Sequence, residues 1–300
     1  MEQALIGRVL ERLTLTRDIT LDLDGLRSVY AAWCASVPFD NTAKLIALGS
    51  QLPGKLPGID ADEFFNRWLT HGVGGTCWPT SNALFELLHS LGFEVRRCAG
   101  SMRDTGVISH GTLKVRIGDR DWLVDSSMLT NFPLPLTQEV FIGSDPVFPI
   151  EIEVHDGAHV IWWDLPPNAA WIPCRLLADD VTHEYYLERY EASRARSPFN
   201  ERIYARRNLT DAMLIVTGNR RILKTRSGVV TTELSDAELY RALREEIGVS
   251  EELLAQLRKT PAWKMSFIPP PPAAGAASGS VREKPDFSRR SVPSGASPST

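Results

Sequence analysis

The hydrophobic periodicity changes twice along this 300-residue chain, and those changes most narrow the choice of fold. From about residue 5 to 92, apolar side chains recur every three or four positions, which predicts amphipathic helices. From about 93 to 175 the pattern alternates, which predicts strands. A third block, 183–260, mixes a helix, several strands and a closing helix. Helices first, strands next and a mixed block last predict an α+β fold rather than a wound parallel sheet.

Composition excludes several classes of protein. The formal net charge of −4 gives no reason to expect nucleic-acid binding. No apolar run approaches the ~18 residues of a membrane span, and the first residues lack the apolar core of a signal peptide. Four cysteines at unpatterned spacing predict neither a disulfide framework nor a metal site. Free thiols then favour a reducing, cytoplasmic location.

After Phe267 the sequence becomes rich in Pro, Ala, Gly and Ser. Such a composition buries too little apolar surface to fold, so we predict a disordered tail.

Cys77 stands between two glycines and an amphipathic helix, in the stretch "HGVGGTCWPTSNALFELLHSLGF". The unpaired N–H groups at a helix start favour a thiolate, which is the reactive form of cysteine. We expect Gly74 and Gly75 to let the backbone turn sharply and to leave room for a substrate. Thr76 is a candidate helix cap. The pattern is typical of a nucleophile, but it also fits a small residue in a closely packed loop.

A cysteine nucleophile needs a base, and the base needs an orienting partner. His110 begins the predicted hairpin "HGTLKVRIGDRDWLVD". With "GDRD" as the turn, the apolar side chains share one face, and His110 and Asp125 share the other. That register puts Lys114 opposite Asp125. His110 then lies four residues along the strand from the position opposite Asp125, which is roughly 13 Å at ~3.3 Å per residue. Two alternatives remain: a Lys114–Asp125 ion pair, or a bulge or strand shear that brings His110 to Asp125.

Taken together, these residues resemble the arylamine N-acetyltransferase family. "VGGTCWPTSNALFELLHSLGFEV" is similar to that family's Arg-Gly-Gly-x-Cys motif and the helix after it. "VPFDN" at 37–41 resembles its Pro-Phe-Glu-Asn stretch, and "SPFNERIYARRNL" and "VVTTELSDAELYRALREEIGV" resemble its C-terminal third. The similarity is spread over roughly residues 5–258.

The resemblance implies a division of the chain and a reaction. It implies a helical domain at 1–92, a β-barrel-like domain at 93–182, an α/β lid at 183–262 and then the disordered tail, which we place at 263–300. It also implies transfer of an acetyl group from acetyl-CoA, through a cysteine acyl-enzyme, to an arylamine or similar nitrogen. Acetyl-CoA would be a co-substrate, and no bound cofactor or metal is expected.

The resemblance also assigns residues. Cys77 would be the nucleophile, His110 the base and Asp125 its orienting partner. Phe39, Trp78 and Phe199 would bind substrate, although Phe199 could equally anchor the lid to the core.

Three departures separate this chain from the family pattern. Val73 stands where the family has arginine, and Trp78-Pro79 replaces an aromatic-Glu pair. After Asp125 the sequence "SSML" replaces Val-Gly-Phe-Gly, a segment that shapes the substrate pocket in the family.

Ten Lys or Arg residues lie between Arg189 and Arg226, against three acidic residues. They could attract the phosphates of CoA to the cleft, or they could belong to a solvated helix face and a charged hairpin.

Other functions share the same residues. An amide synthase would use the triad with an acyl chain on a carrier protein, and a hydrolase or transglutaminase-like enzyme would use it with another acceptor. A non-catalytic descendant would use the cleft to bind a partner.

Overall fold

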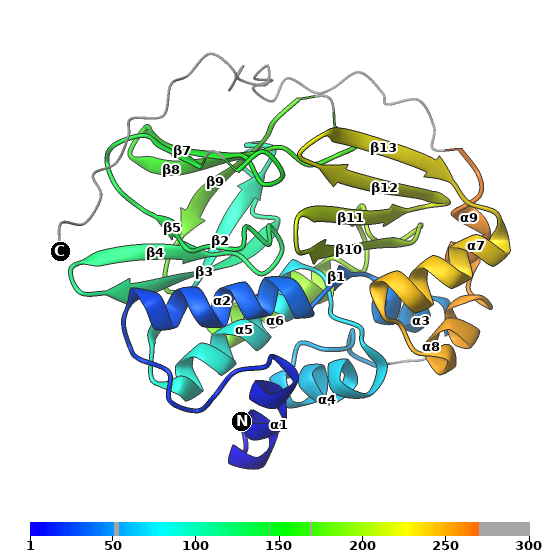
Figure 1. The fold of residues 1–300 in the computed structure, drawn as a ribbon, viewed down its shortest axis with the longest axis horizontal. Coiled ribbons are helices and arrows are strands. Elements are labelled where there is room, and N and C mark those ends of the chain that lie inside the picture. Colours follow the sequence, from blue (N-terminus) through cyan, green and yellow to red (C-terminus); the bar gives the residue numbers. More distant parts are fainter. Residues whose placement is uncertain (51–53, 144, 169, 270–300) are drawn as a thin grey trace.

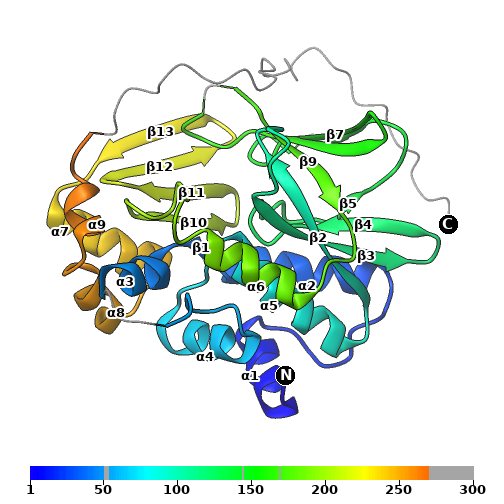
Figure 2. The ribbon, with the colours of Figure 1, turned by 180° about the vertical axis from the view of Figure 1, so that it is seen from behind.

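The computed structural model describes residues 1–50, 54–143, 145–168 and 170–269. A layer of helices lies along one side of two antiparallel sheets (Figure 1), and the view from behind shows the same arrangement (Figure 2). The predicted α+β fold is confirmed. Within the described residues, no helix combines the length and apolar character that crossing a bilayer requires.

The helical layer comes from the N-terminal third of the chain. Its helices are α1 (Gln3–Arg12), α2 (Leu23–Ser36), α3 (Thr42–Ser50), α4 (Ala61–His71) and α5 (Cys77–Leu91). Asp60 caps α4, accepting a hydrogen bond from the Glu63 N–H at 2.9 Å. Gly92 ends α5 in the left-handed conformation that favours glycine.

The larger sheet is strongly curved and forms the barrel-like part of the molecule (Figure 1). Its spatial order is β5-β4-β3-β2-β9-β8-β7-β6, and every neighbouring pair is antiparallel. In chain order the strands are β2 (Glu94–Met102), β3 (His110–Ile117), β4 (Arg120–Val124), β5 (Leu134–Pro135), β6 (Phe141–Gly143), β7 (Ile150–His155), β8 (Ala158–Trp163) and β9 (Ile172–Ala178). His110 is the first residue of β3, and Asp125 directly follows β4.

The smaller sheet joins two distant parts of the chain. Its order is β1 (Phe39–Asp40), β10 (Tyr204–Leu209), β11 (Ala212–Thr217), β12 (Arg220–Thr225) and β13 (Gly228–Glu233). β1 comes from the helical third, yet it pairs with β10, with Phe39 opposite Arg206. Strands β10 to β13 of the predicted lid therefore form one sheet with β1, which comes from the N-terminal helical region.

The remaining helices follow the large sheet or close the chain. They are α6 (His183–Ala192), α7 (Asp236–Arg241), the π-helical turn η1 (Ala242–Ile247), α8 (Glu251–Leu257) and α9 (Pro261–Met265). Ser235 and Glu238 form a capping box at the start of α7. Although α6 opens the predicted lid, Tyr186 and Tyr190 on it lie in the same core as the N-terminal helices.

The predicted start of the disordered tail is wrong. Residue 263 lies inside α9, and Trp263 is buried against Phe267 and the core of the smaller sheet. The apolar Trp263 side chain ties these residues to the fold. The rest of the predicted tail, from residue 270, lies outside the described residues.

The hairpin register also differs from the prediction. The loop is Gly118-Asp119, with Gly118 at φ 61°, so Leu113 pairs with Val124 and Lys114 with Leu123. This shifts the pairing by two residues and keeps every side chain on its predicted face, because side chains alternate with a period of two. Asp125, the residue after β4, therefore lies opposite Thr112, and Thr112 is only two residues from His110 along β3. The predicted Lys114–Asp125 pair is wrong, and Lys114 instead contacts Asp179 at 2.8 Å.

The two glycines before Cys77 serve close packing rather than a sharp turn. Neither Gly74 nor Gly75 has the positive φ that favours glycine. A Cβ atom at Gly74 would lie 1.9 Å from the Pro38 carbonyl oxygen, and one at Gly75 would lie 2.9 Å from the Pro79 ring. The expected turn is therefore wrong, and the glycines let this loop lie against the neighbouring backbone.

Gly74→Ala should therefore lower the free energy of unfolding by about 1–3 kcal/mol or more, since the clashing atom belongs to the backbone. Urea denaturation of both proteins measures the difference.

Gly7→Ala in α1 is the matched control, because its new methyl group would meet only the flexible end of Arg17. We expect it to be neutral or to stabilise the protein by roughly 0.5–1 kcal/mol, as alanine does inside a helix. Equal stability of Gly74→Ala and wild type would contradict the packing role.

Candidate active site

Cys77 is the first residue of α5 and lies 8% exposed at the edge of the main core. Its Sγ atom lies 3.8 Å from the Ser109 carbonyl oxygen, on the residue before His110. Thr76 occupies the cap position as expected, but its side chain makes no capping hydrogen bond. The first N–H groups of α5 are therefore not capped by that side chain.

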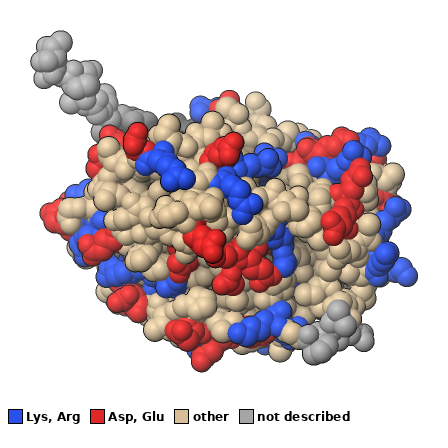
Figure 3. All heavy atoms as spheres, turned by 90° about the horizontal axis from the view of Figure 1, so that it is seen from below, with Lys and Arg blue, Asp and Glu red and all other residues tan. Residues whose placement is uncertain are grey.

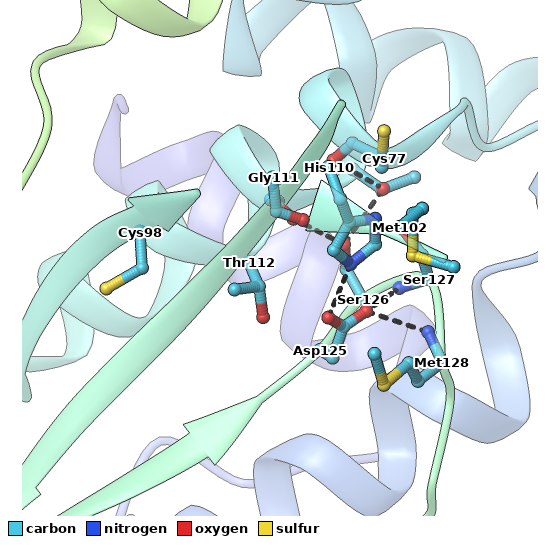
Figure 4. A network of polar contacts seen from close by, with 12 residues as sticks. Cys77, Cys98, Met102, His110, Gly111, Thr112, Asp125, Ser126, Ser127 and Met128 are labelled. Atoms are coloured by element: carbon cyan, nitrogen blue, oxygen red, sulfur yellow. Dashed lines mark hydrogen bonds and ion pairs between the residues drawn. The ribbon is translucent and has the colours of Figure 1, made fainter. Parts of the chain in front are cut away.

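His110 and Asp125 form a buried hydrogen-bonded pair. His110 Nε2 lies 2.7 Å from Asp125 Oδ2, and the two residues are 3% and 1% exposed. Figure 4 shows Cys77 and Asp125 on opposite sides of the His110 ring. A two-residue diagonal offset between neighbouring strands is within reach of such side chains. The structure therefore brings together the three residues that the sequence singled out.

The second oxygen of Asp125 is held by the backbone. Oδ1 accepts hydrogen bonds from the N–H groups of Ser127 at 2.9 Å and Met128 at 2.8 Å. These bonds fix the carboxylate, so Oδ2 is directed at the ring of His110 (Figure 4).

The pair favours its charged form. Burial opposes protonation of His110, but the nearby Asp125 carboxylate outweighs it and raises the pKa of the ring well above its ordinary value. Burial likewise opposes ionisation of Asp125, but His110 and the backbone N–H of Met128 lower the pKa of that carboxyl. An interaction with Cys77 further favours the protonated ring. The arrangement therefore supports an imidazolium beside the thiol.

Tyr30, which sequence reasoning did not single out, fixes the backbone around Asp125. Its buried hydroxyl donates to the Asp125 carbonyl at 2.8 Å and accepts from the N–H groups of Asp125 and Thr130. These contacts join α2 to the loop after β4 across 95 residues of sequence. No local pattern could have indicated them, since Tyr30 reads as one more apolar position of an amphipathic helix.

Lys44 is a second residue that sequence reasoning missed. Its side chain on α3 is 3% exposed and donates to Ser193 Oγ at 2.8 Å. Burial lowers the pKa of Lys44 to about 8, and an electrostatic interaction with nearby Cys77 partly opposes this. The sequence showed only a single lysine in the largely apolar stretch of α3, which does not indicate its burial.

Two of the three predicted substrate-binding residues lie together. Phe39 packs edge-on against Phe199 with ring centroids 5.2 Å apart, and Tyr204 contacts both rings. Phe39 also forms a β-bridge with Gly75, two residues before Cys77. A contact with substrate stays a prediction for Phe39 and Phe199.

Trp78 is the third predicted substrate-binding residue, and its contact with substrate also stays a prediction. Its ring is 3% exposed and packs edge-on against Tyr186, with centroids 5.0 Å apart. It also covers Gly111, where a Cβ atom would lie 2.7 Å from the indole. Because α5 points this side chain between β3 and α6, Trp78 belongs to the core.

A valine, Val73, occupies the position at which the family pattern has an arginine, and it makes apolar contacts. Val73 is fully buried beside Leu45 and the core of the smaller sheet. The glycine loop is held instead by Asp40, whose Oδ2 accepts the Gly74 N–H at 2.7 Å. Burial raises the pKa of Asp40, and the hydrogen bonds from Thr42 and Gly74 partly offset it.

The predicted basic cluster does not form one surface. Arg194 contacts Glu191, Arg221 contacts Glu246 and Lys224 contacts Asp164. Arg206 is buried. On the face drawn in Figure 3, basic and acidic side chains are interspersed and neither forms a continuous patch. Within the described residues, no group of three or more His, Cys, Asp or Glu side chains could hold a metal ion.

Comparison with known proteins agrees with the predicted resemblance. Residues 22–144 match the sequence profile of a family described as N-acetyltransferase. The arylamine N-acetyltransferase of Mycolicibacterium smegmatis is 30% identical over 95 residues, which are 32% of each protein. This alignment therefore spans about a third of that curated relative.

Solved structures extend the likeness to the whole fold. A variant of the Mycobacterium smegmatis arylamine N-acetyltransferase matches with a TM-score of 0.74 at 19% identity, over 87% of this chain and 99% of that one. The Mycobacterium marinum enzyme in complex with CoA gives 0.71 at 19% identity, over 85% and 99%. The Salmonella typhimurium enzyme gives 0.71 at 18%, over 86% and 98%. The resemblance to the arylamine N-acetyltransferase family is confirmed.

Asp125→Asn should change how Cys77 reactivity depends on pH. The raised pKa of His110 keeps the ring charged until the pH rises through that value, and Asp125 is its main cause. Without the carboxylate, burial lowers the pKa of His110, so the loss of the charged ring moves to lower pH. The rate of alkylation by iodoacetamide across pH measures the shift and reports Cys77, since the other three cysteines are fully buried.

Asp24→Asn is the control, because Asp24 pairs with Arg27 at the surface, away from the cysteines. We expect it to leave the alkylation profile unchanged. An identical profile for Asp125→Asn and wild type would contradict the assigned pair.

Lys44→Met should slow the alkylation of Cys77 at neutral pH by roughly 3–10-fold, because it removes a buried cation that favours the thiolate. Lys55→Met, at an exposed position, should leave the rate unchanged. Equal rates for all three proteins would show that Lys44 does not influence the thiol.

Proposed function

We propose that this chain, which resembles the arylamine N-acetyltransferases in residues 22–144 and in its fold, is a CoA-dependent N-acyltransferase. The observation that carries the proposal is the buried 2.7 Å His110–Asp125 pair with Cys77 on the far side of the ring. The acetyl donor would be acetyl-CoA, and the acceptor an arylamine or similar nitrogen. Four free cysteines support a reducing, cytoplasmic setting.

In the first half-reaction the Cys77 thiolate attacks the thioester carbonyl of acetyl-CoA. The bond from that carbon to the CoA sulfur breaks, the acetyl group passes to Cys77, and the CoA thiol leaves with the proton of His110. N–H groups at the start of α5 are suited to stabilise the oxyanion that forms during the attack.

In the second half-reaction the amine attacks the acetyl-cysteine. Neutral His110 takes the proton that the nitrogen loses, the bond from carbon to Cys77 breaks, and the thiolate–imidazolium pair returns. Asp125 stabilises the charged ring in both halves and holds its orientation. No bound cofactor takes part in these steps.

Intact mass after incubation with acetyl-CoA, without acceptor, tests the proposal. We expect one acetyl adduct on the wild type and none on Cys77→Ala, while Cys174→Ala, a change at a fully buried cysteine, keeps it. Adding an amine should remove the adduct and release the acetylated amine.

Other outcomes identify the alternatives. An adduct that decays equally fast without an amine indicates hydrolysis. No adduct on a thiol that iodoacetamide alkylates quickly indicates another donor, such as an acyl chain on a carrier protein. No adduct on a slowly alkylated thiol contradicts catalysis and favours a non-catalytic binding protein.

A further inference from the structure

β13 is the longest exposed sheet edge in the described part of the chain. The other three edge strands are short, since β1 and β5 have two residues each and β6 has three. β13 has six residues, and all six are exposed. Figure 1 and Figure 2 both show it at the rim of the molecule, on the side of the smaller sheet away from α2, α4 and α5. Very short edge strands protect a protein from pairing with another chain, and β13 lacks that protection.

Alternate backbone groups of β13 point away from the sheet. β12 and β13 pair in a continuous antiparallel register. Just beyond β13 the Leu234 N–H donates to the Asn219 carbonyl at 2.7 Å, so the even-numbered residues of the strand bond to β12. The N–H and C=O groups of Val229, Thr231 and Glu233 therefore lie on the free edge, where another strand can bond to them.

The side chains of β13 also suit pairing with another strand. Val229 and Val230 are 50% and 63% exposed, and two threonines follow them. Such β-branched residues favour extended, paired backbone. Natural edges avoid pairing by means of lysine, proline or a bulge, and Gly228–Glu233 contains no lysine or proline and pairs with β12 without a bulge. The edge is therefore suited to accept one more antiparallel strand.

Charge at the two ends of β13 favours a second copy of this chain as the partner. Arg226 lies two residues before the strand, and Glu233 is its last residue. When two copies pair antiparallel, the Arg226 end of each strand lies beside the Glu233 end of the other, so opposite charges meet at both ends. A parallel pair would bring like charges together at both ends.

Symmetry narrows the register of such a pair. Residues that face each other across an antiparallel pair lie on the same side of the sheet, so a two-fold axis has to set one residue opposite its own copy. With Val230 in that position, the two copies of Val230 contact each other and Val229 faces Thr231. Glu233 then faces the residue next to Arg226, so the end charges lie within reach of each other.

We propose that this protein forms a two-fold dimer through β13, in which the smaller sheets of two copies join into one continuous sheet. The dimer goes beyond the proposed acyl transfer and does not depend on it. β1, which forms a bridge with Gly75 in the Cys77 loop, lies at the opposite edge of the smaller sheet. Pairing at β13 therefore leaves the edge beside the catalytic site free.

Sedimentation velocity of the full chain over a range of concentrations tests the proposal. Two six-residue strands form a smaller contact than a standard interface, so we expect a reversible dimer with a dissociation constant of roughly 1–100 μM. Thr231→Pro should stay monomeric throughout that range, because proline removes an N–H from the free edge and none that bonds to β12. The melting temperature of dilute protein and the alkylation rate of Cys77 should stay those of wild type, which shows that Thr231→Pro still folds.

Val230→Lys is a second variant that keeps every backbone group. It sets two lysines opposite each other, so we expect dimerisation to weaken by roughly 3–10-fold. Val107→Lys is the matched control, because Val107 is 65% exposed in the loop between β2 and β3, and it should dimerise like wild type.

A charge exchange tests whether the partner is a second copy in antiparallel orientation. Arg226→Glu should weaken the dimer, because it brings acidic groups together at both ends. Adding Glu233→Arg to the same chain should restore it, because each end then again meets its opposite charge. Failure of the double variant to recover would contradict this arrangement.

Three further results would overturn the proposal. A single monomeric species at every concentration would mean that β13 does not pair with a second copy. A dimer that neither Thr231→Pro nor Val230→Lys weakens would place the interface elsewhere. Slow amide exchange across 228–233 in dilute, monomeric protein would mean that another segment of the same chain covers the edge. Because sedimentation needs no substrate, these outcomes are separate from those of the acyl-transfer assay.

Discussion

The buried ion pair between His110 and Asp125 is the interaction on which the rest of the site depends. Two such groups lose their hydration when they are buried, and the cost is offset only by close geometry and further hydrogen bonds. The structure supplies both, through the 2.7 Å contact and the backbone N–H groups of Ser127 and Met128. Tyr30 then fixes the Asp125 backbone from a different helix. The carboxylate is therefore placed by the whole fold rather than by its own strand.

A substitution of either His110 or Asp125 alone would also affect the Cys77 thiol. Cys77 reaches His110 because α5 begins beside the strand that carries the histidine, and the glycine loop packs on the Pro38 backbone. Where the family pattern has an arginine, this chain has a buried valine, and Asp40 holds the loop through Gly74. At this one departure from the family motif, apolar packing and one backbone hydrogen bond hold the loop.

Much of this could be predicted from sequence. The change in periodicity predicted the helical and strand regions, and the family resemblance assigned Cys77, His110 and Asp125. The hairpin was predicted on the correct faces but with the wrong pairing, because alternation fixes which face a residue occupies and not the length of the loop. Gly118 with its positive φ allowed the tighter turn that halves the offset between His110 and Asp125.

The sequence by itself determined which side chains carry chemistry, since a nucleophile, a base and a carboxylate can be recognised by residue type, local pattern and resemblance. Only the tertiary structure decided which other side chains surround them. Trp78 became core because α5 turns it toward Tyr186, and Lys44 and Arg206 became buried cations because distant segments close over them. Burial and partners arise from contacts between residues far apart in the chain, and no local pattern contains that information.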